Sequence, residues 1–300
     1  MSAVSPSNSV SDRAIDLKQR AYAAVDGLER SLAEARQTDA CMRTGTHGRR
    51  RSGTGEEFWQ FRPAADGDPA RLIDWRRSAK SDGHFVRDRE MQTSNSVIFW
   101  ADGSRSMQFS GNAGRPPKND RSRLIALAAA ILFARTEERV GVLGSPGRPA
   151  AGLRQIDQMA HELFGGDGAE CGLPGAAGLP KGARLVLLSD FLAPIEDIRA
   201  SIENFAGSGA TGALVQILDP VELNFPYDGR TLFRSVAGTV RFESFKAGGL
   251  RLAYQSRLRE RMEAVAGIAE EFGWRKSLHM TNSNVRTALN WLCGLSGSDR

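Results

Sequence analysis

The chain has 300 residues, of which 41% are hydrophobic and 25% are charged, a composition that is typical of a globular protein and excludes a disordered or fibrous one. Forty Lys and Arg residues are interleaved with thirty-five Asp and Glu residues, so the net charge is only +5. The short basic run at 49–51 also lacks interleaved aromatic residues for base stacking. We therefore expect one large or two modest cores, and no nucleic-acid partner.

The cysteines and the first residues indicate the compartment. Cys41, Cys171 and Cys293 are odd in number and lack CxxC spacing, which fits a reducing environment. The first twelve residues lack the basic start and apolar stretch of a secretory signal. The longest apolar run, 124–134, is far below the roughly 18 to 20 residues that span a bilayer. We expect a cytoplasmic protein without a membrane span.

The first 94 residues divide into two regions. Apolar residues recur at spacings of three, four or seven from Ser11 to about Gln37, which predicts an amphipathic helix in an N-terminal helical segment, residues 1–40. Such a helix either lies on the core or forms a coiled-coil arm for a partner. Residues 41–94 are rich in Gly, Arg and Asp with short extended pieces, which predicts a small β-rich region.

Short apolar runs alternate with helical patterns from Ser96 onward. We expect strands at 97–100, 139–143, 184–188, 213–218 and 277–280, a hairpin over 231–242, and helices at 124–135, 153–164, 195–205, 252–272 and 284–292. The helix at 252–272 is expected to place its apolar residues on one face, namely Leu252, Leu258, Met262, Val265, Ala269 and Phe272. Short apolar strands that alternate with helices are typical of a parallel sheet covered on both faces. Residues 95–300 are therefore predicted to form one α/β domain with a mostly parallel, Rossmann-like sheet.

The candidate chemistry lies at the ends of two predicted strands. A DxSxS run, Asp102, Ser104 and Ser106, directly follows the first core strand and supplies one carboxylate and two hydroxyls. Asp190 closes a later apolar strand, and the carboxyl ends of parallel strands gather at one edge of a sheet. Oxygen donors of this kind suit a hard divalent ion, so these four residues predict a site for Mg²⁺ or Mn²⁺. The alternative is that Asp102 and Ser104 merely cap a turn or a helix start.

These residues and two further blocks resemble known families. The DxSxS run followed by Met107 looks like the opening of the metal-ion-dependent adhesion site of von Willebrand factor A domains. A block in the N-terminal region, residues 53–79, is similar to the signature of the family called domain of unknown function 58. The residues of this N-terminal block that carry the similarity are Gly55, Glu57, Phe58, Gly67, Asp68, Arg71, Asp74 and Trp75. A second block of that family matches at Asp219, Pro220, Glu222, Phe225, Pro226 and Gly229. The resemblance covers roughly residues 43–245.

The resemblance implies a von Willebrand A-like domain fused to a small β region, working beside a MoxR-type AAA ATPase. By the resemblance, Ser104 and Ser106 touch the ion, while Asp102 and Asp190 hold it directly or through water. Adhesion sites of this class usually add a threonine from a middle loop, and residues 148–152 contain none. The ion is then bound weakly, has its shell completed by water, or has been lost.

The N-terminal block has a physical interpretation of its own. Asp68, Arg71 and Asp74 are expected to form a charge-paired network beside Trp75. Such a network serves either as a structural plug that locks the β region or as a direct contact with a partner.

These features favour a non-catalytic protein-interaction module that binds a protein partner through a metal-ion-dependent adhesion-like site. The sequence contains no GxxxxGK[ST], HExxH or GxSxG motif, and its four histidines are not paired at ligand spacing. Two alternatives remain. One is a metal-dependent hydrolase in which Asp102 and Asp190 hold a water-activating ion, and the other is a metal-free structural adaptor.

Overall fold

The computed structural model describes residues 10–26, 28, 52–63, 85–90, 96–165, 169–175, 179–180, 182–235 and 241–294. The chain divides into two compact units, one made of residues 1–32 and 95–300 and the other of residues 33–94.

The smaller unit contains an antiparallel pair of strands, β1 (Ser52–Pro63) and β2 (Phe85–Glu90). The pairing shifts register between Gly53 and Phe58, and this irregular stretch holds Gly55 and Glu57. Gly55, Glu57 and Phe58 of the family signature therefore lie on β1. The other signature residues lie outside the described part of the chain, namely Gly67, Asp68, Arg71, Asp74 and Trp75.

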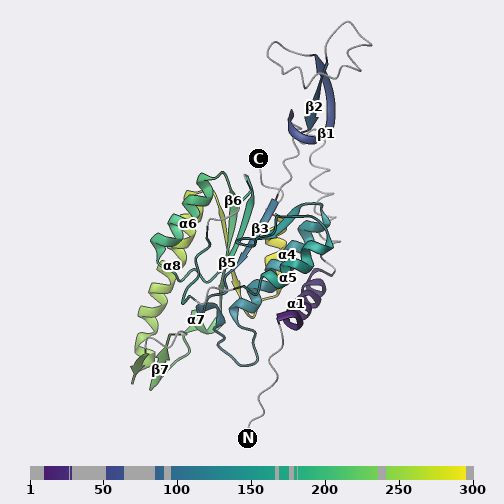
Figure 1. The fold of residues 1–300 in the computed structure, drawn as a ribbon. Helices are drawn as coiled ribbons and strands as arrows, with labels where there is room; N and C mark the ends of the chain where they lie inside the picture. Colours follow the sequence, from purple (N-terminus) through teal and green to yellow (C-terminus); the bar gives the residue numbers. More distant parts are fainter. Residues whose placement is uncertain are drawn as a thin grey trace. The chain divides into compact units, whose positions relative to one another are not determined.

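A five-stranded parallel sheet forms the centre of the larger unit (Figure 1). In the order in which they lie side by side, its strands are β4 (Arg139–Val142), β3 (Ser96–Ala101), β5 (Arg184–Ser189), β6 (Thr211–Leu218) and β9 (Arg275–Met280). Because helices cover both faces, the central strands are continuous apolar runs rather than alternating ones. The predicted fold class, a Rossmann-like α/β sheet with helices on both faces, is confirmed.

The side chains of the strands divide the core between the two faces. Val97 and Phe99 of β3 are buried in one core, and Ile98 between them is buried in the other, as the period of two along a strand requires. The first core packs under α4 (Lys118–Arg135), α5 (Leu153–Glu162) and α9 (Val285–Gly294). The second packs under α6 (Ile195–Gly207) and α8 (Arg251–Glu271), on the other side of the sheet (Figure 1).

The N-terminal helix α1 (Val10–Val25) explains why α4 is apolar on nearly every side. Ala14, Leu17 and Ala21 of α1 are buried in the same core as α4. Eleven of the eighteen residues of α4 are buried, because the sheet covers one side of the helix and α1 another. For the described part of α1, the interpretation as a helix that lies on the core is confirmed.

The C-terminal half differs from the prediction at the start of α8. The expected hairpin is present as β7 (Thr231–Arg234) and β8 (Arg241–Ser244), and its turn lies outside the described residues. We expected Leu252 to lie on the buried face of the long helix, but Leu252 is 78% exposed whereas Leu258 is 8% exposed. The first turn of α8 lies near the hairpin and away from the sheet, so core packing begins only at Leu258 (Figure 1).

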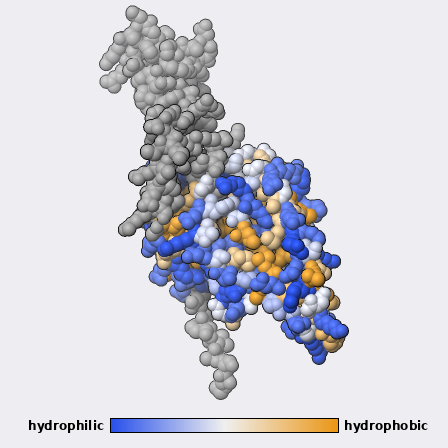
Figure 2. All heavy atoms as spheres, turned by 180° about the vertical axis from the view of Figure 1, so that it is seen from behind, coloured by the Kyte–Doolittle hydropathy of each residue, from blue (hydrophilic) through white to orange (hydrophobic). Residues whose placement is uncertain are grey.

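No helix in the described ranges is long and apolar enough to cross a bilayer. Figure 2 shows one face of the molecule, on which hydrophilic residues predominate and hydrophobic residues gather toward the middle.

His279 of β9 is a buried histidine that the fold keeps neutral. The residue is 3% exposed, and among the described residues its Nε2 atom has no hydrogen-bond partner. Burial, together with the charge of Arg121, lowers the pKa of His279 from 6.5 to about 4. Between these two pH values the unfolded chain binds a proton that the native chain does not, so the free energy of unfolding falls as the pH falls.

We expect His279→Gln to flatten the pH dependence of stability. The histidine contributes a slope of about 1.4 kcal/mol per pH unit between its native and unfolded pKa values. Urea unfolding at several pH values between 6.5 and 4 measures this slope in the native chain and in the variant. His161→Gln is the control, because His161 is exposed. Equal slopes for the native chain and the His279 variant contradict the prediction.

Candidate functional site

The order of the strands brings two predicted carboxylates to one place. In chain order the five strands lie as 2-1-3-4-5, and open sheets of this kind bind ligands outside the carboxyl ends of the strands, where the order reverses. That point lies between β3 and β5, which are paired neighbours. Asp102 follows β3 and Asp190 follows β5, so both predicted residues lie at this edge.

Asp102 is buried and held by neutral donors. Its backbone N donates to Leu188 O at 2.9 Å, which extends the pairing of β3 and β5 by one residue. Its Oδ1 atom accepts a hydrogen bond from Ser104 N at 2.8 Å, and its Oδ2 atom accepts one from Ser189 Oγ at 2.6 Å. Burial raises the pKa of the Asp102 carboxyl, and the charge of Asp190 adds to this effect, although the hydrogen bonds from Ser189 and Ser104 oppose it.

The two serines of the DxSxS run present their hydroxyls to each other. Ser104 Oγ and Ser106 Oγ lie 3.2 Å apart, and both residues are buried. Ser106 begins the short helix η2 (Ser106–Gln108), and its N donates to Glu170 O at 2.8 Å. Neighbouring ligand oxygens of an octahedral Mg²⁺ with bonds of about 2.0–2.1 Å are separated by roughly 3 Å. The two hydroxyls form a hydrogen bond with each other, and their separation is also close to that of two adjacent ligands.

Asp190 has a partner that the sequence did not predict. Lys118, the first residue of α4, places its Nζ atom 2.9 Å from Asp190 Oδ2 and 2.7 Å from Glu222 Oε1. The lysine side chain is 1% exposed. Burial disfavours its charge, but the two carboxylates outweigh burial and raise the pKa of Lys118. The site thus contains a cation of its own beside the position predicted for a divalent ion.

A second carboxylate network follows β6. Asp219 and Glu222 form a capping box at the start of α7 (Pro220–Asn224), in which Asp219 N donates to Glu222 Oε2 at 2.7 Å. Asp219 also accepts hydrogen bonds from Thr281 Oγ1 at 2.8 Å and from Arg115 at 2.9 Å. Burial opposes ionisation of Asp219, but these donors and backbone N–H groups outweigh it and lower the pKa of the carboxyl. Asp219 is therefore a fully paired carboxylate.

The connection between α5 and β5 passes over this edge of the sheet. Leu163 packs in the core under α4, whereas Cys171 and Leu173 pack against the core under α6 and α8, so the residues before and after this edge lie on opposite faces of the sheet. Gly172 comes so close to Asp102 that an added Cβ atom would lie 2.2 Å from Asp102 Oδ1. Only glycine fits at this position without displacement. The segment 169–175 therefore helps to bury Asp102.

Comparison with models of protein families shows to which family the chain belongs. A family model described as protein of unknown function DUF58 matches residues 60–264. The chain belongs to the DUF58 family. No curated protein matches it. Among solved structures, the conserved hypothetical protein BatB from Bacteroides thetaiotaomicron is similar over 68% of this chain and 100% of its own, with 15% identity and a TM-score of 0.35.

The DUF58 match confirms the family that the two sequence blocks resembled. It does not test the four predicted metal-binding residues, but the structure shows how well they suit an ion. In the described part of this DUF58 chain, no group of three or more His, Cys, Asp or Glu side chains is arranged for a metal. The predicted set differs from such groups because it combines two carboxylates with two hydroxyls. These donors fit Mg²⁺ or Mn²⁺ by type and by hydroxyl spacing, whereas Lys118 competes for Asp190.

Sequence reasoning missed the charged partners of this site. Asp219 and Glu222 belong to the second DUF58 block, and their spacing after a strand is that of a capping box, which was a usable signal. Lys118 gave only a weak signal, as a charged residue at the start of an apolar helix. Nothing local links Lys118 to Asp190, 72 residues away. The other residues without a local signal are Arg115 and Thr281.

Proposed function

We propose that this DUF58 chain is a non-catalytic protein-interaction module that binds a carboxylate of a protein partner through Mg²⁺ or Mn²⁺. The hydroxyl pair of Ser104 and Ser106, 3.2 Å apart at the reversal of strand order, is the observation that carries the proposal. Ser104 and Ser106 contact the ion, and Asp102 and Asp190 hold it directly or through water. When bound, the ion supplies an electropositive coordination position for the carboxylate of the partner.

The partner that we propose is a MoxR-type AAA ATPase, which the resemblance in sequence implies. The low charge of the site supports the use of a carboxylate for recognition. Two serine hydroxyls are neutral ligands, and Lys118 already neutralises part of the charge of Asp190. An ion held there keeps more of its positive charge than one held by three or four carboxylates.

Removing one hydroxyl tests the proposal. We expect Ser104→Ala to weaken Mn²⁺ binding by roughly 10-fold or more, because the variant loses a direct ligand. Titration calorimetry measures the binding, and co-purification with a MoxR-type AAA ATPase, in magnesium and then in chelator, measures capture of the partner. Ser208→Ala is the matched control, since Ser208 is exposed and its hydroxyl donates to Phe205 O within its own turn.

Two outcomes of this experiment contradict the proposal. One is equal Mn²⁺ affinity for the native chain and the Ser104 variant, and the other is capture of the ATPase that chelator leaves unchanged. Turnover of phosphoesters or peptides that is lost in Asp190→Asn identifies the chain as a metal-dependent hydrolase instead.

A metal-free interaction module is the second candidate, and Lys118 is the observation that favours it. The lysine ammonium lies within hydrogen-bond distance of Asp190 and Glu222 and is fully buried, so it supplies a positive charge where the adhesion-like site needs one. In this candidate the site is a permanent ionic cluster that joins the start of α4, the end of β5 and α7, and the partner binds to the outer surface of these elements. Failure of the native chain to bind Mn²⁺ or Mg²⁺, with retained capture of the partner, supports this candidate over the first.

A further inference from the structure

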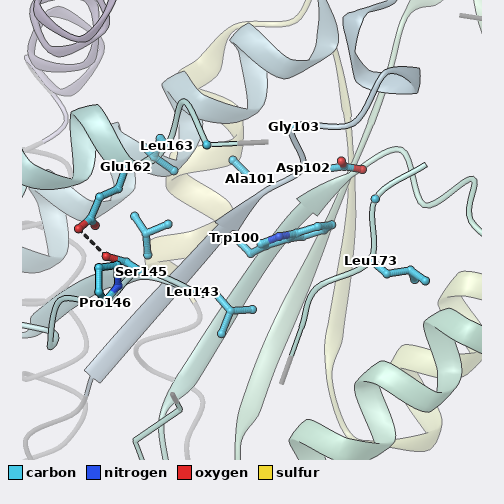
Figure 3. Close-up of a pocket in the computed structure, with 14 residues that line it drawn as sticks. Trp100, Ala101, Asp102, Gly103, Leu143, Ser145, Pro146, Glu162, Leu163 and Leu173 are labelled. Carbon is cyan, nitrogen blue, oxygen red and sulfur yellow. Dashed lines mark hydrogen bonds between the residues drawn. The ribbon is translucent and has the colours of Figure 1, made fainter. Parts of the chain in front are cut away.

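A cavity of about 490 Å³ adjoins the predicted site at the ends of β3 and β4 (Figure 3). Trp100, Leu143 and Leu173 form part of its apolar wall. Figure 3 shows Asp102 at one end of this cavity and Glu162, with Ser145, at the other. The cavity thus has an apolar middle with a carboxylate at each end.

The carboxylates at the two ends of the cavity differ in their exposure to solvent. Asp102 is 1% exposed beneath the segment 169–175, whereas Glu162 is only half-buried. Ser145 Oγ donates to Glu162 Oε1, and Gln158 Nε2 donates to the same oxygen at 2.7 Å. Within the described chain Glu162 Oε2 has no hydrogen-bond partner, so it remains for a ligand. Two neutral donors hold Glu162 in place.

The carboxylates at this edge of the sheet fall into two groups. Lys118 neutralises Asp190 and Glu222, and Arg115 neutralises Asp219. In the described part of the chain, neither carboxylate of the cavity forms a salt bridge, and the residues that line the cavity include no Lys, Arg or His. The Glu162 carboxylate of the cavity therefore carries negative charge that no described side chain compensates. Buried and half-buried charges of this kind favour a ligand of opposite sign.

We propose that this cavity binds an aliphatic cation, a guanidinium or ammonium group on an alkyl chain. Such a group matches both parts of the cavity, because its methylene chain packs against the apolar wall while its charged head contacts Glu162. The indole of Trp100 adds a face suited to a cation. The ligand is the side chain of an arginine or lysine from a partner segment, or a small alkyl amine of the same chemistry. The charged contact of the ligand is with Glu162, which is not among the residues proposed to hold a metal.

The test uses the full chain in the presence of chelator, so its result does not depend on metal binding. Titration calorimetry measures binding of N-acetyl-arginine amide, with N-acetyl-citrulline amide as the neutral probe of nearly the same shape. We expect the arginine probe to bind at least about tenfold more tightly than the citrulline probe, and added salt to weaken its binding. Equal affinities for the two probes, or no binding of either, overturn the proposal.

A matched pair of variants locates the binding. Glu162→Gln keeps the shape of the side chain and removes its charge, and we expect it to weaken binding of the arginine probe about tenfold. Glu203→Gln, an exposed position on α6, is expected to leave binding unchanged. Urea unfolding of both variants shows that each is folded. Unchanged affinity in a folded Glu162 variant overturns the assignment to this cavity.

A third arm compares a peptide with a free amine. If acetyl-Gly-Arg-Gly amide binds more tightly than agmatine, the proposal holds and the source is a segment of a protein. If agmatine binds more tightly, the proposal holds for a small alkyl cation. Failure of both overturns it, and none of these results bears on the metal-dependent capture that Ser104→Ala tests.

Discussion

Replacing Lys118 by methionine is expected to lower the free energy of unfolding by about 3–5 kcal/mol, which corresponds to a fall in Tm of roughly 6–20 °C for a domain of this size. Methionine fills a similar volume, but it leaves Asp190 and Glu222 buried without their cation. Removing one member of a buried ionic cluster lowers the free energy of unfolding by far more than the intact cluster adds to it, because the remaining buried charges are uncompensated. Urea unfolding of the native chain and the variant measures the difference.

A surface pair of the same chemistry is the control for Lys118. Lys18 lies 2.8 Å from Asp157, a distance close to that between Lys118 and Asp190, but both partners are substantially exposed. Lys18→Met is therefore expected to cost no more than about 1 kcal/mol. Similar losses for the two methionine variants would falsify the view that Lys118 neutralises a buried cluster.

The same variant separates the two candidate functions. If the ammonium of Lys118 stands in for a divalent ion, its removal opens that position, and Mg²⁺ should raise the Tm of Lys118→Met more than that of the native chain. If the ion and the lysine occupy separate positions, Mg²⁺ should stabilise both proteins to a similar extent. Thermal melting with magnesium and with chelator distinguishes these outcomes.

Replacing Gly172 by alanine is expected to destabilise the chain by about 1–3 kcal/mol and to displace the segment 169–175 from Asp102. The added methyl group would lie 2.2 Å from Asp102 Oδ1. The carboxylate has little freedom to move aside, because Ser104 N and Ser189 Oγ both hold it. The segment has to shift instead, which exposes the edge of the sheet. Urea unfolding and Mn²⁺ titration measure the two effects.

Gly175 provides a control within the same segment. An added Cβ atom at Gly175 would meet no atom of the described residues within 4 Å, so Gly175→Ala is expected to be nearly neutral or slightly stabilising. Equal destabilisation by the two alanine variants would show that the conformational freedom of glycine, rather than contact with Asp102, matters in this segment. Gly172→Ala is also expected to change Mn²⁺ binding, whereas Gly175→Ala is not.

The two proposed recognition elements lie side by side on the same edge of the sheet. In the first proposal the serine hydroxyls accept an ion and, through it, a carboxylate, and in the second the cavity beside Glu162 accepts a cation. Asp102 contributes to both, because it follows the DxSxS strand and also lines the cavity. A partner segment that presents an acidic and a basic side chain close together would engage both elements at once. Such a pairing sets the orientation of the partner as well as its affinity.

The sequence by itself determined the elements and the class of fold. Continuous apolar runs at β3, β5 and β6 and helical patterns between them specify a parallel sheet with covered faces, since local periodicity reports which side chains are buried. The same logic placed Asp102 and Asp190 at one edge, because the carboxyl ends of parallel strands share an edge whatever their order. The prediction that Leu252 is buried was wrong, because the spacing of apolar residues along a helix does not show where the core beneath the helix ends.

Only the tertiary structure decided which charges meet. The contact between Lys118 and Asp190 joins residues 72 positions apart, and that between Lys118 and Glu222 joins residues 104 apart. The sequence has forty basic residues, and the position of Lys118 at the start of an apolar helix does not show which carboxylates it contacts. The approach of Gly172 to Asp102 likewise depends on the path of a connection from one face of the sheet to the other. Electrostatic pairing depends on distance in space, and that distance is set by the order of the strands rather than by any short stretch of sequence.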